Sequence, residues 1–99
     1  MKSWKAAIRN VNKALHITQH DRNDIAGNPE DNFERIALCW TAMLSDKLKP
    51  GEAVTAPDTA RMMITMKMCR DAHMPHNDNR IDAHGYTLCL DRVEPLEDE

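Results

Sequence analysis

The sequence predicts an all-α protein, a small four-helix bundle formed by a single domain over residues 1–99. Apolar residues recur with helical spacing in four segments, and most of the five prolines and three glycines fall between those segments. No segment alternates apolar and polar residues in the way of a β-strand. The expected helices are followed by an acidic tail at 94–99 and cover about residues 4–18, 29–46, 56–73 and 80–94.

The first expected helix, residues 4–18, begins after Ser3, whose side chain is suited to an N-cap. Its apolar residues share one face, which we expect to turn toward the core: Trp4, Ala7, Ile8, Val11, Ala14 and Leu15. The opposite face is basic and is either a solvated surface or a site for an acidic partner; it carries Lys2, Lys5, Arg9 and Lys13.

The second expected helix, residues 29–46, has a clear start. Asn28 is a preferred N-cap residue, Pro29 fits the first helical position, and the acids that follow complement the helix dipole. Its expected core stripe consists of Phe33, Ile36, Ala37, Trp40, Met43 and Leu44.

The third expected helix, residues 56–73, opens with the capping-box spacing of Thr55 and Asp58. Its apolar residues cover most of its circumference, which predicts a place in the middle of the bundle. The fourth, residues 80–94, contains Gly85, which costs about 1 kcal/mol relative to alanine inside a helix. We therefore expect another helix or a ligand to approach the backbone closely at Gly85.

Composition excludes several classes of protein. The net charge of −3 gives no overall attraction to nucleic acid or to anionic lipid. No stretch approaches the ~18 apolar residues of a membrane span, and the N-terminus lacks the apolar segment of a secretory signal. Three cysteines cannot form a complete set of intramolecular disulfides, and we expect them to pack in the core. A cytoplasmic protein is predicted, without membrane or nucleic-acid partners.

Charged residues fall on inward faces of the third and fourth helices. Asp82 lies in the same sector of its helix as Ile81 and Leu88, and Lys67 or Arg70 of the third helix also points inward. One interpretation is a buried ion pair between Asp82 and Arg70 that fixes helix register.

The other interpretation of these charges is a binding site. Asp78 and Asp82 would join Glu34 or Asp58 to hold Mg²⁺, and Lys67 and Arg70 would meet phosphate oxygens. A separate zinc site is a weaker possibility, since thiolate and imidazole are zinc ligands; its residues would be Cys69, His73 and His76.

Several ordered blocks of residues resemble a family of small phage and prophage proteins without an assigned function. The resemblance covers about residues 20–93 and rests on Asn28 to Ile36, Trp40, Asp58 to Arg70, Asn77 to Asn79, and the spacing Asp82-x-x-Gly85-Tyr86. It implies a phage-encoded all-α domain.

More distantly, the helix with Asp82-x-x-Gly85-Tyr86 is similar to the last metal-bearing helix of MazG-like nucleotide pyrophosphohydrolases and of phage nucleotide-modification-associated domains. This similarity implies a MazG-like arrangement in which Mg²⁺ activates a water that releases pyrophosphate from a nucleotide. Asp78, Asp82 and Glu34 would hold the metal, with Lys67 and Arg70 beside the phosphates.

Two functions follow from these patterns. One is a nucleotide-related protein, either a binder or a Mg²⁺-dependent pyrophosphohydrolase. The alternative is a non-enzymatic phage protein that binds and inhibits a host or defence-system protein during host takeover. In either case the modest core favours a homo-oligomer, such as a dimer that buries a methionine-rich face.

Overall fold

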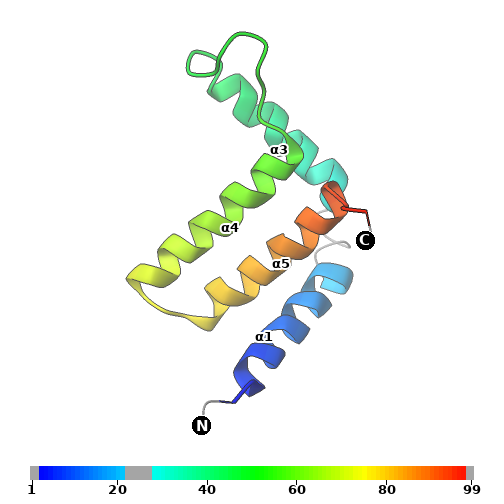
Figure 1. The fold of residues 1–99 in the computed structure, drawn as a ribbon, viewed down its shortest axis with the longest axis vertical. Coiled ribbons are helices and arrows are strands. Elements are labelled where there is room, and N and C mark those ends of the chain that lie inside the picture. The colour runs from blue at the N-terminus through cyan, green and yellow to red at the C-terminus, as the bar shows by residue number, and fades with distance from the viewer. Residues whose placement is uncertain (1–2, 22–27, 98–99) are drawn as a thin grey trace.

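The computed structural model describes residues 3–21 and 28–97, and it confirms the all-α prediction (Figure 1). Within these residues no β-strand occurs, and none of the helices combines the length and hydrophobicity needed to span a bilayer. A π-helical turn, η1 (Ile17–Asp21), continues the first helix. The α-helices are α1 (Lys5–His16), α3 (Pro29–Met43), α4 (Ala56–His73) and α5 (Asn77–Val93).

The helix starts follow their capping residues. Asn28 accepts a hydrogen bond from the Asp31 N–H at 2.9 Å, and Thr55 and Asp58 form both bonds of the predicted capping box. α4 has the predicted range of 56–73, and α3 ends three residues before the predicted 46. α5 starts three residues earlier than predicted, because the His76 imidazole accepts the Asp78 N–H at 3.0 Å and serves as the N-cap.

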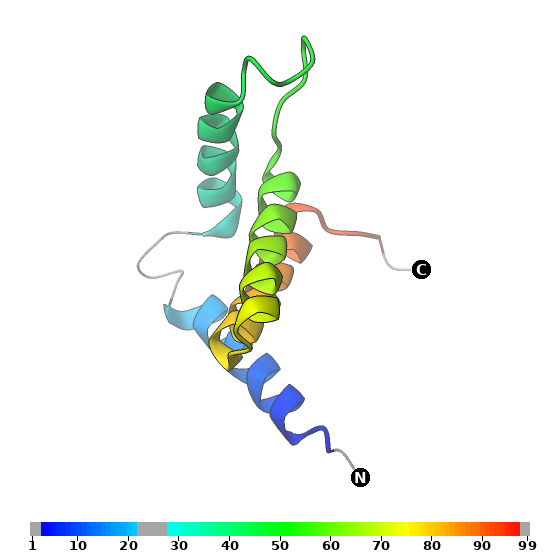
Figure 2. The same cartoon turned by 90° about the vertical axis from the view of Figure 1, so that its left-hand side faces the viewer.

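Three helices lie side by side in one layer, with α5 between α1 and α4 (Figure 1). α3 packs against both α4 and α5 and stands to one side of that layer (Figure 2). The middle position predicted for α4 is therefore wrong, because α5 occupies it. The reason lies in side-chain size: α5 buries Ala83 and Cys89 and carries Gly85, so neighbours can approach it on both sides.

The core is small and lies where α3, α4 and α5 meet. Phe33, Ala56, Ala60 and Cys89 form the buried cluster, and the ring of Tyr86 lies 6.3 Å from that of Phe33. Among the eight buried hydrophobic residues of the described part, only Phe33 and Ile81 are larger than cysteine. The described helices thus bury few of the large apolar side chains that usually stabilise a domain.

The predicted core face of α1 is confirmed for Ala14, which is buried, and is wrong for the large apolar side chains. Its large apolar side chains lie at the surface, and their exposed fractions are 78% for Trp4, 57% for Ile8, 43% for Val11 and 39% for Leu15. α1 instead contacts α5 through a neighbouring face on which Asn10 and Ala14 are buried. Ala14 permits a close approach, and the Asn10 side chain donates a hydrogen bond to Asn77 Oδ1 at 3.2 Å. We call the four exposed residues the α1 stripe.

Predictions for the two ends of the chain and for the core stripe of α3 are met in part. The N-cap of α1 is Trp4, and Ser3 accepts a hydrogen bond from the Lys5 N–H at 3.3 Å. Lys2 of the predicted basic face and residues 98–99 of the predicted tail lie outside the described residues. In α3, Trp40 is half-buried, whereas Met43 of the expected core stripe is exposed.

The close approach predicted at Gly85 is present. A Cβ atom added at Gly85 would lie 3.3 Å from the hydroxyl oxygen of Thr18 in η1, which is tighter than an ordinary van der Waals contact. Gly85 therefore allows η1 to rest against α5.

We expect Gly85→Leu to destabilise the fold. Its side chain cannot fit beneath Thr18, and overpacking of this kind costs about 1–3 kcal/mol, which outweighs a gain in helix propensity of up to ~1 kcal/mol. Thermal unfolding followed by circular dichroism measures the change. His84→Leu, at the exposed neighbouring position, is the matched control. Equal unfolding midpoints for Gly85→Leu and His84→Leu would contradict the close contact between Gly85 and Thr18.

Candidate functional site

Asp82 is paired with Lys67, and the predicted pair with Arg70 is wrong. The Lys67 Nζ atom lies 2.8 Å from Asp82 Oδ2, and the two side chains are 15% and 22% exposed. Lys67 continues the face on which Ala60 and Met63 meet α5, at helical spacings of three and four. Arg70 lies beyond this face and is exposed. The inward charges thus hold α4 against α5.

The cavity beside Asp82 is too small for a nucleotide. It lies between α5, α1 and η1, and Gly85 and Thr18 are among the residues that line it. Its volume is about 10 Å³, close to the minimum that one water molecule requires.

The structure does not bring together the three predicted metal ligands. Asp82 binds Lys67, and Asp78 lies at the exposed start of α5 beside His76. Glu34 lies on α3 in a separate groove, and Asp58 is held in the capping box of α4. Within residues 3–21 and 28–97, no three His, Cys, Asp or Glu side chains form a group that could hold a metal ion.

The predicted zinc ligands are likewise not grouped in the described part of the chain. Cys69, His73 and His76 are all exposed. Core packing is confirmed for Cys89, which is buried, and is wrong for Cys39 and Cys69.

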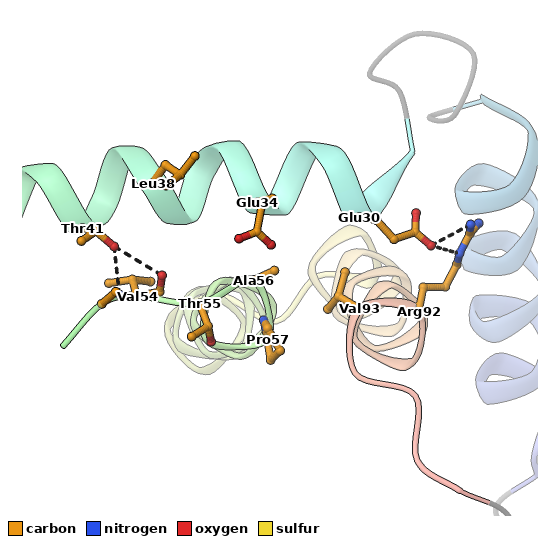
Figure 3. A pocket seen from close by; sticks show the side chains of 11 residues that line it. Glu30, Glu34, Leu38, Thr41, Val54, Thr55, Ala56, Pro57, Arg92 and Val93 are labelled. Atoms are coloured by element: carbon orange, nitrogen blue, oxygen red, sulfur yellow. Dashed lines mark hydrogen bonds and ion pairs between the residues drawn. The ribbon is translucent and has the colours of Figure 1, made fainter. Parts of the chain in front are cut away.

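A groove lies between α3, the start of α4 and the end of α5, and we call it the α3–α4 groove (Figure 3). Its volume is about 390 Å³. The Glu34 carboxylate points into it, toward the first turn of α4, where a negative charge is favoured by the helix dipole (Figure 3). Apolar side chains supply much of the wall: Leu38, Val54, Ala56 and Val93.

Two polar contacts fix the groove at its ends. The Thr41 hydroxyl donates to the Ala37 carbonyl at 2.8 Å and accepts the Val54 N–H at 2.9 Å, which ties the segment before α4 to α3. At the other end Arg92 donates from Nε to Glu30 Oε1 at 2.8 Å (Figure 3). The groove is therefore held by contacts between segments far apart in the sequence.

Sequence reasoning missed a network around Asp71. Its carboxylate accepts the His76 N–H at 3.1 Å and two guanidinium nitrogens of Arg80 at 3.2 Å. The His76 N–H bond and the Arg80 hydrogen bonds lower the pKa of Asp71 from its ordinary value of 3.8. The network closes the connection between α4 and α5. No spacing rule links Asp71 to Arg80, because the intervening turn decides whether they meet.

Comparison with known proteins supports the phage part of the predicted resemblance. A family model described as "Domain of unknown function (DUF6378)" matches residues 9–94. The "Gene 55 protein" of Mycobacterium phage D29 is 32% identical over 92 residues, 90% of this chain and 57% of the relative. The "Gene 55 protein" of Mycobacterium phage L5 is 36% identical over 87 residues, 87% of this chain and 53% of the relative.

The chain thus spans a little more than half the length of these curated relatives. No solved structure matches it. None of these matches carries the predicted similarity to MazG-like hydrolases.

We expect Lys67→Met to destabilise the protein by about 1–3 kcal/mol, because the half-buried ion pair between Lys67 and Asp82 is lost. Arg70→Met, at an exposed position on the same helix, should change stability by no more than ~0.5 kcal/mol. Urea unfolding of both variants measures the difference. A larger loss of stability in Arg70→Met than in Lys67→Met would contradict the pair of Asp82 with Lys67 and support the predicted pair with Arg70.

The Asp71 network predicts a pH dependence. A carboxyl whose pKa is lowered on folding stabilises the fold above its ordinary pKa of 3.8, and the contribution disappears as the pH falls through the lowered value. Asp71→Asn should therefore lose stability at pH 7 and show a shallower decline in stability below pH ~4 than the unmodified protein. Urea midpoints across this range test it. Asp46→Asn, at an exposed aspartate after α3, should leave the decline unchanged.

Proposed function

This chain belongs to the DUF6378 family, a family of unknown function, and we propose that it is a non-enzymatic phage protein that binds a protein partner in the host cytoplasm. The partner class is a host or defence-system protein whose action is blocked when the phage protein is bound. We place the binding surface on α1. The described residues assemble no group of metal ligands.

The exposed α1 stripe carries this proposal. α1 is the most amphipathic of the four α-helices, yet its large apolar side chains are exposed, from 39% at Leu15 to 78% at Trp4. Contiguous apolar surface on a soluble protein marks an interaction site more often than single exposed residues do. An amphipathic helix docks by laying such a face into an apolar groove of its partner.

The charges on α1 restrict the chemistry of that partner. α1 contains Lys5, Arg9 and Lys13 and no acidic residue, although the whole chain has a net charge of −3. Of these cations Lys5 lies nearest the α1 stripe, and Arg9 and Lys13 lie on the opposite face, so a complementary surface combines an apolar groove with a carboxylate near Lys5. The negative charge of the chain as a whole disfavours an anionic lipid surface as the partner.

The other predicted function, Mg²⁺-dependent nucleotide binding or pyrophosphohydrolysis, has less support from the geometry. Lys67 is engaged by Asp82, and the adjacent cavity has room for about one water molecule. Glu34 lies in a different groove from Asp82. A protein-binding function requires none of these residues to converge.

Photo-crosslinking in host cells tests the proposed function. A photoreactive residue at Ile8 should form a discrete adduct with a protein, and Val11→Asp should abolish that adduct because it introduces a charge into the apolar face. A photoreactive residue at Met62, an exposed α4 position that is 45% accessible, is the control. Binding of the identified protein is then measured with purified components. Absence of any protein adduct from Ile8, or the same adducts from Met62, would refute the proposal.

A further inference from the structure

We infer that a second copy of this chain is one partner of the α1 stripe, with α1 of each copy seated in the α3–α4 groove of the other. This inference rests on the proposed function, because both assign an occupant to the same apolar face, and a second copy and the host protein therefore exclude each other there. It makes the protein a two-fold symmetric dimer, in which each contact occurs twice.

The surface of the isolated chain is large for its mass. Its accessible area is 7634 Å², whereas a compact monomer of 11.3 kDa is expected to have roughly 5,700 Å². The radius of gyration is 15.3 Å, against ~12.6 Å for a compact domain of this length. The excess of roughly 1,900 Å² is within the ~1,000–2,500 Å² that each chain of an obligate homodimer buries. One copy therefore exposes about as much additional surface as a stable dimer would cover.

The α3–α4 groove has the chemistry that α1 requires. Its wall is apolar at Leu38, which is 67% exposed, and at Val54 and Val93. Glu34 points its carboxylate into the groove from α3, whereas Glu30 is bound by Arg92 at the end of the groove (Figure 3). A second copy therefore offers the apolar complement of the α1 stripe, and the Glu34 carboxylate is opposite in sign to Lys5, the α1 cation that lies nearest the stripe.

The dimensions of the two surfaces agree. The α1 stripe runs from Trp4 to Leu15, and the α3 side of the groove runs from Glu30 to Thr41. Each spans eleven residue steps, which at about 1.5 Å per residue is ~16 Å of helix. A single helix face can therefore fill the groove along its length.

The position of α1 favours a contact between copies over one within the chain. α1 is packed on α5 through Asn10 and Ala14, and it runs toward the end of the molecule opposite the loop that joins α3 to α4 (Figure 2). The molecule is 52 Å long. In the proposed dimer the two molecules are antiparallel, and the α1 of each lies beside the groove of the other.

Light scattering after size-exclusion chromatography gives the first test. The unmodified protein should have about twice the 11.3 kDa mass of one chain. Ile8→Asp and Leu38→Asp should each weaken dimerisation at least tenfold, because a charge enters the apolar contact. Both side chains are more than half exposed in one copy, so circular dichroism should show folded protomers. Met62→Asp, an exposed apolar position outside both surfaces, should leave the dimer intact.

A mixing experiment tests the pairing of α1 with the groove. The Ile8→Asp chain retains an unmodified groove, and the Leu38→Asp chain retains an unmodified α1. A mixed dimer therefore contains one undamaged contact, whereas each variant alone contains none. Native mass spectrometry should show more mixed dimer than either variant's own dimer.

The outcomes separate this inference from the proposed function. A monomeric protein at all accessible concentrations overturns the inference, and so does a dimer that tolerates Leu38→Asp. If a photoreactive residue at Ile8 crosslinks to a different protein and never to a second copy, the inference is overturned and the proposed function stands. If Ile8 gives no protein adduct and Ile8→Asp has no effect on mass, both fail.

Discussion

The small side chains of α5 are the constraint on which the arrangement of the other helices depends. Helices pack only as closely as the residues between them allow, and α5 has Ala83, Gly85 and Cys89 where its neighbours approach. Because it can be approached on more than one side, α5 contacts α1, α3, α4 and η1. The result is a small bundle in which α1, α5 and α4 form one layer and α3 stands beside it. Large apolar side chains consequently remain at the surface of α1.

The starts of helices could be predicted from the sequence, whereas the neighbours that each helix face meets could not. The caps at Asn28 and Thr55 depend on residues within three positions, so the starts of α3 and α4 were predictable. The α1 stripe was also predictable as a shared face, but periodicity does not say whether a face meets the core. The same limit applies to Lys67 and Arg70, because only the position of α5 decides which of them reaches Asp82.

The candidate sites follow the same rule. Residues on different helices can each point inward and still lie far apart along the helix axes, as Glu34 and Asp82 do in their separate hollows. The α3–α4 groove depends on a bond between Thr41 and Val54, which no residue spacing reveals. The modest core predicted from the sequence agrees with the few large side chains that the described residues bury. The exposure of the α1 stripe follows from the contact of α1 with α5 through Asn10 and Ala14, which periodicity does not indicate.

The short connection between α4 and α5 has a consequence for the order of folding. Only residues 74–76 separate the two helices, so bringing them together closes a very short loop and costs little chain entropy. Joining α1 to α5 requires contacts such as Asn10 with Asn77, which are 67 residues apart. Pairs of local helices form quickly, whereas contacts at long sequence separation form late. We therefore expect the α4–α5 hairpin to form early in folding and α1 to dock onto it later.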